Sequence, residues 1–300
     1  MDYIVANHRF TIRGKTPQIF QKYLTCGHPF QTINNSNTEK KFTVVLDSHL
    51  EDWNHKFDLF SQRKKISVFE YENSVCEIFQ YKNEYLIRLE FKDKKDALLI
   101  VSENNNTVFL TNFSSQEQTE IYDFQFLLWL IYGIATLNEN TVAIHASTIV
   151  YQNQAILFLG ESGTGKSTHT HLWQKHIKGS FVLNDDSPIV RIINGKPMAF
   201  GSMWSGKSAY YINESYPIAG MVRIVQAKQN TIKKLNKLEA LAAVYPSCPP
   251  MFAHDKRLSE NISEILSSIL IETPIFTLYC LPDLDSVSVS FSAIFENLKR

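Results

Sequence analysis

The stretch GESGTGKS, residues 160–167, has the composition and spacing of a loop that binds phosphate. Gly160, Gly165, Lys166 and Ser167 fit the pattern G-x-x-x-x-G-K-[ST], with an apolar run before it and a helical pattern after it. Glycines let the backbone curl so that N–H groups point at phosphate oxygens, and the following helix adds partial positive charge. We expect Lys166 to reach the β- and γ-phosphates and Ser167 to ligate Mg²⁺. The pattern therefore predicts a site for ATP and Mg²⁺, although it does not decide between ATP and GTP, and the expected binding residues are Gly160, Glu161, Ser162, Gly163, Thr164, Gly165, Lys166, Ser167 and Thr168.

Two adjacent carboxylates, Asp185 and Asp186, end the apolar run FVLNDD that follows the loop. A carboxylate at a strand end beside a phosphate loop can complete the ligand shell of Mg²⁺. Because neighbouring residues on an extended strand point to opposite sides, either the chain turns and brings both to the site, or only one is functional. If both face the site, their repulsion raises one pKa, and that carboxylate suits the acceptance of a proton.

Three further side chains are candidates on weaker signals. His145, in VAIHAST, lies before the loop in an apolar run, where a single histidine is more often a core residue than a catalytic one. Arg223, in GMVRIVQA, could supply a second cation for the charge that develops during phosphoryl transfer. Lys207, in GSMWSGK, either contacts a transferring phosphoryl group or faces water from a hairpin.

The elements that would position these residues fall into two regions. Residues 1–115 contain extended runs separated by short polar breaks, which predict a mainly antiparallel β domain that supports the fold or recognises a substrate. Residues 116–300 begin with an apolar helix at 124–137 and then place the loop between a strand and a helix. Further on, Asn194-Gly195 predicts a hairpin turn. We therefore expect an α/β P-loop domain with a mixed sheet behind the β domain.

Composition narrows the classes of partner. The chain has 30 basic and 30 acidic residues, so no overall field favours nucleic acid or an anionic membrane. The apolar helix is shorter than a bilayer span, and the first residues do not read as a secretory signal. We expect a cytoplasmic protein whose four cysteines are reduced and buried.

Together, IHASTIV, GESGTGKS and VLNDD resemble the HPr serine kinase/phosphorylase family and its structural relatives, the phosphoenolpyruvate carboxykinases. In that family a histidine sits on the strand before the phosphate loop, and a later strand ends in paired aspartates. The resemblance covers residues 143–190. The segment GSMWSGK also looks like part of an uncharacterised bacterial kinase-like branch, some members of which look like partners of peptide-maturation systems. The basic signature that the family carries after the second aspartate is missing, which leaves open the acceptor and the reverse phosphorolysis.

The resemblance implies a P-loop domain of the HPr kinase/phosphoenolpyruvate carboxykinase type and a division of work at its site. It implies that Asp185 is the general base, that His145 is its partner, and that Asp186 lies at the metal with Ser167. The order within the aspartate pair is not settled by the motif. The resemblance also implies assembly into a homo-oligomer.

The leading hypothesis is an ATP-dependent kinase that transfers the γ-phosphoryl group to a hydroxyl of serine or threonine in a protein or peptide. A second hypothesis is an enzyme similar to the phosphoenolpyruvate carboxykinases that acts on a small acidic metabolite. A third is a non-catalytic, nucleotide-gated binding module whose β-rich domain grips a partner. Fold alone does not decide among them.

Overall fold

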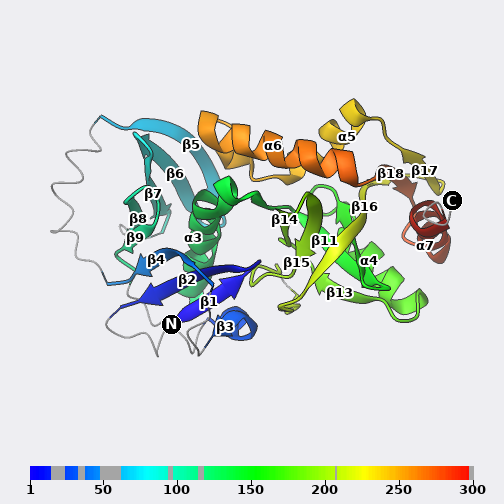
Figure 1. Cartoon of the computed structure of the whole chain (residues 1–300), viewed down its shortest axis with the longest axis horizontal. Helices are drawn as coiled ribbons and strands as arrows, with labels where there is room; N and C mark the ends of the chain where they lie inside the picture. The colour runs from blue at the N-terminus through cyan, green and yellow to red at the C-terminus, as the bar shows by residue number, and fades with distance from the viewer. Residues whose placement is uncertain are drawn as a thin grey trace. The chain divides into compact units, whose positions relative to one another are not determined.

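The structure is a computed structural model, and it describes residues 1–14, 24–32, 38–47, 62–93, 97–113, 118–206 and 208–296. The chain forms two compact units, one of residues 1–137 with 251–259, the other of residues 138–250 with 260–300. Each contains a nine-stranded mixed sheet within the described residues. The fold class is therefore α/β with two mixed sheets (Figure 1).

The first unit is built on a sheet of strand order β3-β1-β2-β4-β9-β8-β7-β6-β5. Its strands are β1 (Asp2–Val5), β2 (His8–Arg13), β3 (Gln31–Thr32), β4 (Lys40–Val45), β5 (Lys64–Tyr71), β6 (Ser74–Tyr81), β7 (Glu84–Phe91), β8 (Ala97–Glu103) and β9 (Val108–Thr111), with the 3-10 turn η1 (Thr25–Phe30). Residues 72–73 and 82–83 form the two-residue turns that join β5, β6 and β7, where the polar breaks predicted them. The sheet is mixed because β4 runs parallel to both β2 and β9. An alternating sequence specifies which face of a strand is buried but not its direction, so the sequence did not reveal this parallel pairing.

Aromatic side chains form the core between this sheet and helix α3 (Gln118–Thr136). The rings of Phe10 and Phe42 stack with centroids 4.8 Å apart, and the ring of Tyr132 from α3 lies edge-on to both. The hydroxyl of Tyr132 donates a hydrogen bond to the carbonyl of Val5 (3.1 Å). The apolar helix predicted at 124–137 is thus confirmed as a buried helix. Among the helices of the described residues, none combines the length and hydrophobicity needed to span a membrane.

Residues 251–259 belong to the first unit through polar contacts as well as apolar ones. The hydroxyl of Tyr85 donates to Oδ2 of Asp255 (2.8 Å), and Oδ1 of Asp255 accepts from the amide of Leu258 (2.8 Å). The unit boundary after Leu137 lies beyond the predicted boundary at 115/116, and α3 falls in the first unit. The roles expected for the two domains stay predictions.

The second unit contains the sheet path β10-β14-β15-β16-β12-β11-β13, with β18 beside β16 and β17 beside β18. The strands are β10 (Thr141–Ala143), β11 (Ala146–Tyr151), β12 (Gln154–Leu159), β13 (Phe181–Asn184), β14 (Ile189–Ile193), β15 (Lys196–Phe200), β16 (Ser215–Gln226), β17 (Thr231–Lys234) and β18 (Ile275–Cys280). Strand β16 runs parallel to β12 and β18, whereas β11 runs antiparallel to both β12 and β13. The mixed sheet predicted for this region is confirmed. The Asn194-Gly195 hairpin between β14 and β15 is also present, with positive φ at both residues.

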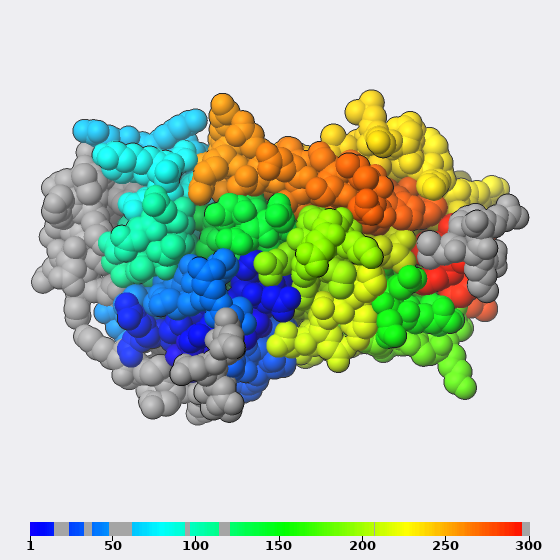
Figure 2. Space-filling view, in the orientation of Figure 1, coloured from blue at the N-terminus to red at the C-terminus, as the bar shows by residue number. Residues whose placement is uncertain are grey.

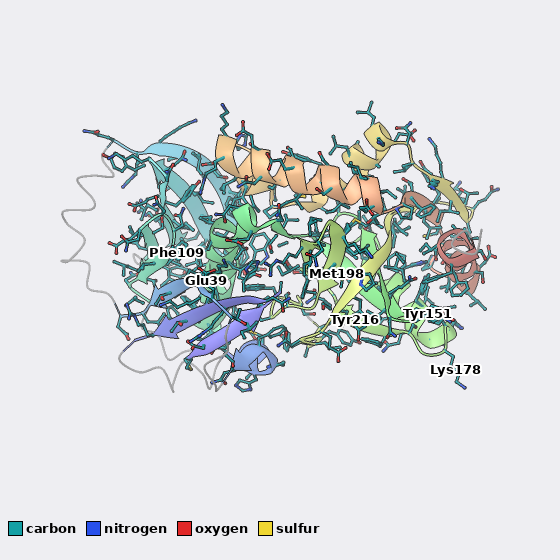
Figure 3. All side chains as sticks on the ribbon, viewed as in Figure 1. Glu39, Phe109, Tyr151, Lys178, Met198 and Tyr216 are labelled. Carbon is teal, nitrogen blue, oxygen red and sulfur yellow. The ribbon has the colours of Figure 1, made fainter. Side chains whose placement is uncertain are left out.

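Helices α4 (Lys166–His176) and α7 (Leu284–Phe291) and the π-helical η6 (Ser292–Glu296) contribute to a core of the second unit that includes Trp173. The unit also contains α5 (Lys237–Val244), the short turn η4 (Tyr245–Ser247) and most of α6 (Lys256–Glu272), which begins in residues of the first unit. The short turns η3 (Leu137–Glu139) and η5 (Pro250–Phe252) contain residues of both units. The last described segment of the chain is helical over α7 and η6. Tyr151, labelled in Figure 3, holds this segment through edge contacts with Phe291 and Phe295. The four cysteines are buried and free, as predicted.

Candidate active site

The predicted phosphate loop connects the end of β12 to the first residue of α4. Gly160, Gly163 and Gly165 have φ values of 150°, 79° and 103°, which L-residues with a side chain rarely adopt. A Cβ at Gly160 would lie 2.5 Å from the hydroxyl of Thr164, so side-chain bulk is excluded there as well. Gly165 is the N-cap of α4, and the first amides of the helix have no partners within it. The local sequence therefore produces a curled loop that leads directly into a helix N-terminus.

Lys166 lies across this loop rather than in solvent. Its Nζ donates hydrogen bonds to the carbonyl oxygens of Gly160 (2.9 Å) and Glu161 (3.1 Å), and the residue is 7% exposed. Burial lowers the pKa of Lys166, while the charges of Asp186 and Asp185 act in the opposite direction. The ammonium group is thus held at the loop, within electrostatic reach of both carboxylates.

Strand β16 braces the loop from the side. Gln226 Nε2 donates to the carbonyl of Gly163 (3.2 Å). Arg223, which is paired with Leu159 in the β12–β16 ladder, places Nη2 3.9 Å from a carboxylate oxygen of Glu161 and donates from Nη1 to the carbonyl of Ala243 (3.2 Å). Arg223 is therefore beside the loop, where its present contacts tie the loop to the end of α5.

Asp185 is held by hydroxyl groups at the end of β13. Ser147 Oγ donates to Oδ1 of Asp185 (2.5 Å), and Ser208 Oγ donates to Oδ2 (2.8 Å). The Ser147 hydroxyl also contacts the hydroxyl of Thr170 in α4 (2.8 Å). This chain of contacts connects Asp185 to the helix that follows the phosphate loop.

The backbone turns directly after β13, and this turn brings the second carboxylate to the site. Asn184 Oδ1 accepts hydrogen bonds from the amides of Asp186 (3.1 Å) and Ser187 (2.9 Å), an arrangement by which asparagine side chains stabilise turns. Asn184 is itself buried and donates to the carbonyl of Ser202 (3.3 Å). Of the two alternatives left open by the sequence, the structure shows the one in which both carboxylates lie near Lys166.

His145 faces Asp186 and not Asp185. The chain between β10 and β11 is fixed by hydrogen bonds from the amide of His145 to the carbonyl of Ser247 (2.7 Å) and from the amide of Ala146 to the carbonyl of Asp186 (3.0 Å). These bonds place His145 Nε2 3.5 Å from Asp186 Oδ1. This contact arises because the turn after Asn184 directs Asp186 towards the gap between β10 and β11, while hydroxyls hold Asp185. The predicted catalytic partnership of His145 with Asp185 stays a prediction.

Burial and nearby charges shift the pKa values of His145 and Asp186 in opposite directions. Burial, and then the nearby charge of Lys166, lowers the pKa of His145 to about 4, so the imidazole is neutral at pH 7. Burial raises the pKa of Asp186; the charge of Lys166 opposes this shift and the charge of Asp185 adds to it. The His145 and Asp186 side chains are 42% and 45% exposed, so water screens their mutual interaction and remains able to reach both. The pair therefore forms the solvent-accessible side of the site.

The residues present fit a nucleotide phosphate with Mg²⁺. A Cβ added at Gly163 or Gly165 would meet nothing within 4 Å, so open space lies against the glycine backbone there. The Ser167 side chain belongs to the first turn of α4, and Asp185 is linked to the same helix through Ser147 and Thr170. Among the described residues, no group of three or more His, Cys, Asp or Glu side chains could hold a metal by itself.

The structure thus brings together His145, Lys166, Asp185, Asp186 and Arg223 around the loop, whereas Lys207 lies outside the described residues. Sequence reasoning missed four contributors: Ser147, Asn184, Ser208 and Gln226. Two carried a usable signal. Ser147 is two residues after His145, a spacing that shares a face in a strand, and asparagine at a strand end is a common turn former. Ser208 and Gln226 are distant in sequence and carry no such signal.

Comparison with known proteins finds a distant structural likeness. No family model and no curated protein matches the chain. Among solved structures, the chain is similar to the Hpr(Ser) kinase/phosphatase from Coxiella burnetii, with 10% identity, a TM-score of 0.31, and coverage of 52% of this chain and 97% of that chain. A likeness at this level does not determine a function.

Proposed function

We propose that the chain is an ATP-dependent kinase with a P-loop domain of the HPr kinase type, which phosphorylates a serine or threonine hydroxyl in a protein or peptide. The observation that carries the proposal is the position of Lys166, which lies in the phosphate loop and interacts with both Asp185 and Asp186. A phosphate loop alone fits any nucleotide-binding protein. A loop lysine beside two carboxylates and a neutral histidine has the groups that phosphoryl transfer to a hydroxyl requires.

The phosphate-holding groups lie on one side of this arrangement. The amides at the start of α4, the glycine backbone and Lys166 would bind the phosphates, and Ser167 with Asp185 would hold Mg²⁺. Bound MgATP would supply the transferable phosphoryl group and the neutralising metal charge. Gln226 and Arg223 keep the loop in shape from β16.

The proton-accepting groups lie on the other side. Asp186 is the better candidate for the general base, because His145 contacts it. A Cβ at Gly206 would come within 3.0 Å of the Asp186 Cβ, so glycine allows this close approach. The acceptor hydroxyl would donate its proton to Asp186, and neutral His145 would orient that carboxylate. This order reverses the one that the family resemblance implied, in which Asp185 was the base.

Transfer of labelled phosphate from γ-labelled ATP to proteins and peptides of a cell extract tests the proposal. We expect label on a discrete serine or threonine with the wild type, found by mass spectrometry, and none with Lys166→Ala or Asp186→Asn. Label confined to small acidic metabolites would instead support the carboxykinase-like alternative. Tight ATP binding with neither transfer nor hydrolysis would support the binding module.

A further inference from the structure

A cavity in the second unit lies between the end of β17, the first half of α5 and the end of α6. It has a volume of about 330 Å³ and is lined by residues that include Lys234, Lys237, Ala240, Ile271, Glu272 and Thr273. Figure 2 shows α5 and the C-terminal part of α6 next to each other on the face in view. Pockets that bind small ligands begin at roughly 300 Å³, so this cavity suits a small molecule or a single peptide end.

Apolar side chains form part of the cavity lining and one rim. Ala240 and Ile275 are buried at 4% and 3% exposure, and both line it. Ile271 also lines it but is 69% exposed, and Leu238, next to Lys237 on α5, is 78% exposed. Each exposed aliphatic side chain alone would be ordinary, but together with a cavity they provide apolar surface for a bound group to cover.

Two lysines that line the cavity, Lys234 and Lys237, differ from the neighbouring Lys233 in that their charges are not paired among the described residues. Lys233 forms an ion pair with Glu239 (2.6 Å). Within the part of the chain that the structure describes, Lys234 and Lys237 have no carboxylate at ion-pair distance. Glu272 is the one acid among the lining residues, so the two lysines leave a net positive charge. The cavity therefore favours an anion.

We propose that this cavity binds a small carboxylate that carries an apolar body, with its charge at Lys234 and Lys237 and its apolar part against Ala240 and Ile271. The site is separate from the phosphate loop. None of the residues that line the cavity belongs to the loop at residues 160–167. The proposal therefore does not depend on ATP or on kinase activity.

Calorimetric titration of the whole chain with 4-phenylbutyrate tests it, with the neutral 4-phenylbutyramide as the matched compound. We expect the carboxylate to bind about tenfold more tightly than the amide, with an advantage that shrinks as salt is added, because the two lysines are exposed. N-acetyl-leucyl-leucine distinguishes the source of the carboxylate: binding of this compound in preference to 4-phenylbutyrate identifies a peptide end, and the reverse identifies a free acid.

Charge-reversal variants connect the binding to this cavity. Lys234→Glu/Lys237→Glu should weaken carboxylate binding at least about tenfold, whereas Lys178→Glu/Lys196→Glu, on exposed residues elsewhere in the unit, should leave it unchanged. Lys178 projects away from the fold in Figure 3. Ile271→Ser should weaken the binding of 4-phenylbutyrate and of 4-phenylbutyramide by the same factor. Absence of binding by both carboxylates, or equal binding by the two charge-reversal variants, would overturn the proposal.

Discussion

The sheets of the two units differ in how their strands follow one another, and the difference accounts for where the candidate site lies. In the first unit, β5 to β9 follow one another as antiparallel neighbours, and large aromatic rings fill the core. In the second unit, the extended run at 141–151 is interrupted at Ile144 and His145, and β13 ends in a turn. The interruptions take polar side chains out of the regular ladder and direct them to one place. The residues of the candidate site therefore lie at interruptions of strands in the second unit.

The largest expected effect concerns the aromatic core beneath the sheet of the first unit. Phe42 is fully buried, stacks on Phe10 and contacts Phe109, so Phe42→Ala should lower the free energy of unfolding by roughly 3–5 kcal/mol. Urea denaturation followed by circular dichroism measures the loss. Val68→Ala, at an exposed position of β5, is the control and should change the free energy little. Equal effects of the two substitutions would contradict the stabilising role given to the aromatic core.

The second prediction concerns the phosphate loop of the second unit, where a substitution should weaken ligand binding and leave folding largely unchanged. Lys166→Ala removes the cation from the phosphate loop, and we expect about a hundredfold loss of ATP affinity, or roughly 3 kcal/mol. The melting temperature should change little by comparison. Lys175→Ala, an exposed lysine near the end of the same helix, should bind ATP as the wild type does. Retained ATP affinity in Lys166→Ala would exclude the loop as the phosphate site.

A third prediction uses pH to probe the core beneath the loop. His169 is buried, contacts Ser290 and Phe158, and burial lowers its pKa to about 4, although the charge of Asp283 opposes this. The unfolded chain, with a histidine pKa near 6.5, binds the proton more readily. This residue's contribution, roughly 3 kcal/mol, is therefore present above pH 6.5 and is lost as the pH falls towards 4.

Unfolding free energies measured at pH 7 and pH 5 test whether stability falls as the pH is lowered. His169→Gln should show a smaller decrease in stability between the two values than the wild type, whereas His176→Gln, at an exposed position of α4, should keep the wild-type decrease. The same decrease in all three proteins would show that His169 does not cause it.

The smallest expected effect concerns the brace from β16. Gln226→Ala removes one hydrogen bond to the loop, that to Gly163, and should weaken ATP binding about fivefold, or about 1 kcal/mol. Gln174→Ala, an exposed glutamine on α4, is the control. An effect as large as that of Lys166→Ala would mean that the loop collapses without Gln226, while no effect would remove Gln226 from the site.

Local sequence predicted the elements of the site better than their contacts. The glycine spacing and the apolar runs were sufficient for β12, the loop and α4, because their causes lie within a few residues. The contact between His145 and Asp186 depends on the Asn184 turn and on a hydrogen bond to Ser247, which is more than a hundred residues from His145. The parallel pairing of β4 with β2 and β9 was likewise not predictable, because side-chain alternation is the same in either direction. Contacts between distant segments are therefore what the sequence alone did not reveal.

The most direct test of the account compares the two aspartates that share Lys166. MgATP affinity and single-turnover hydrolysis of ATP should be measured for Asp186→Asn and Asp185→Asn side by side. We expect Asp186→Asn to bind MgATP nearly as the wild type does but to lose at least about a hundredfold in rate, the size of a general-base contribution. Asp185→Asn should instead require more Mg²⁺ for ATP binding. A wild-type rate in Asp186→Asn, or loss of its nucleotide affinity, would contradict the assignment of Asp186 as the proton acceptor.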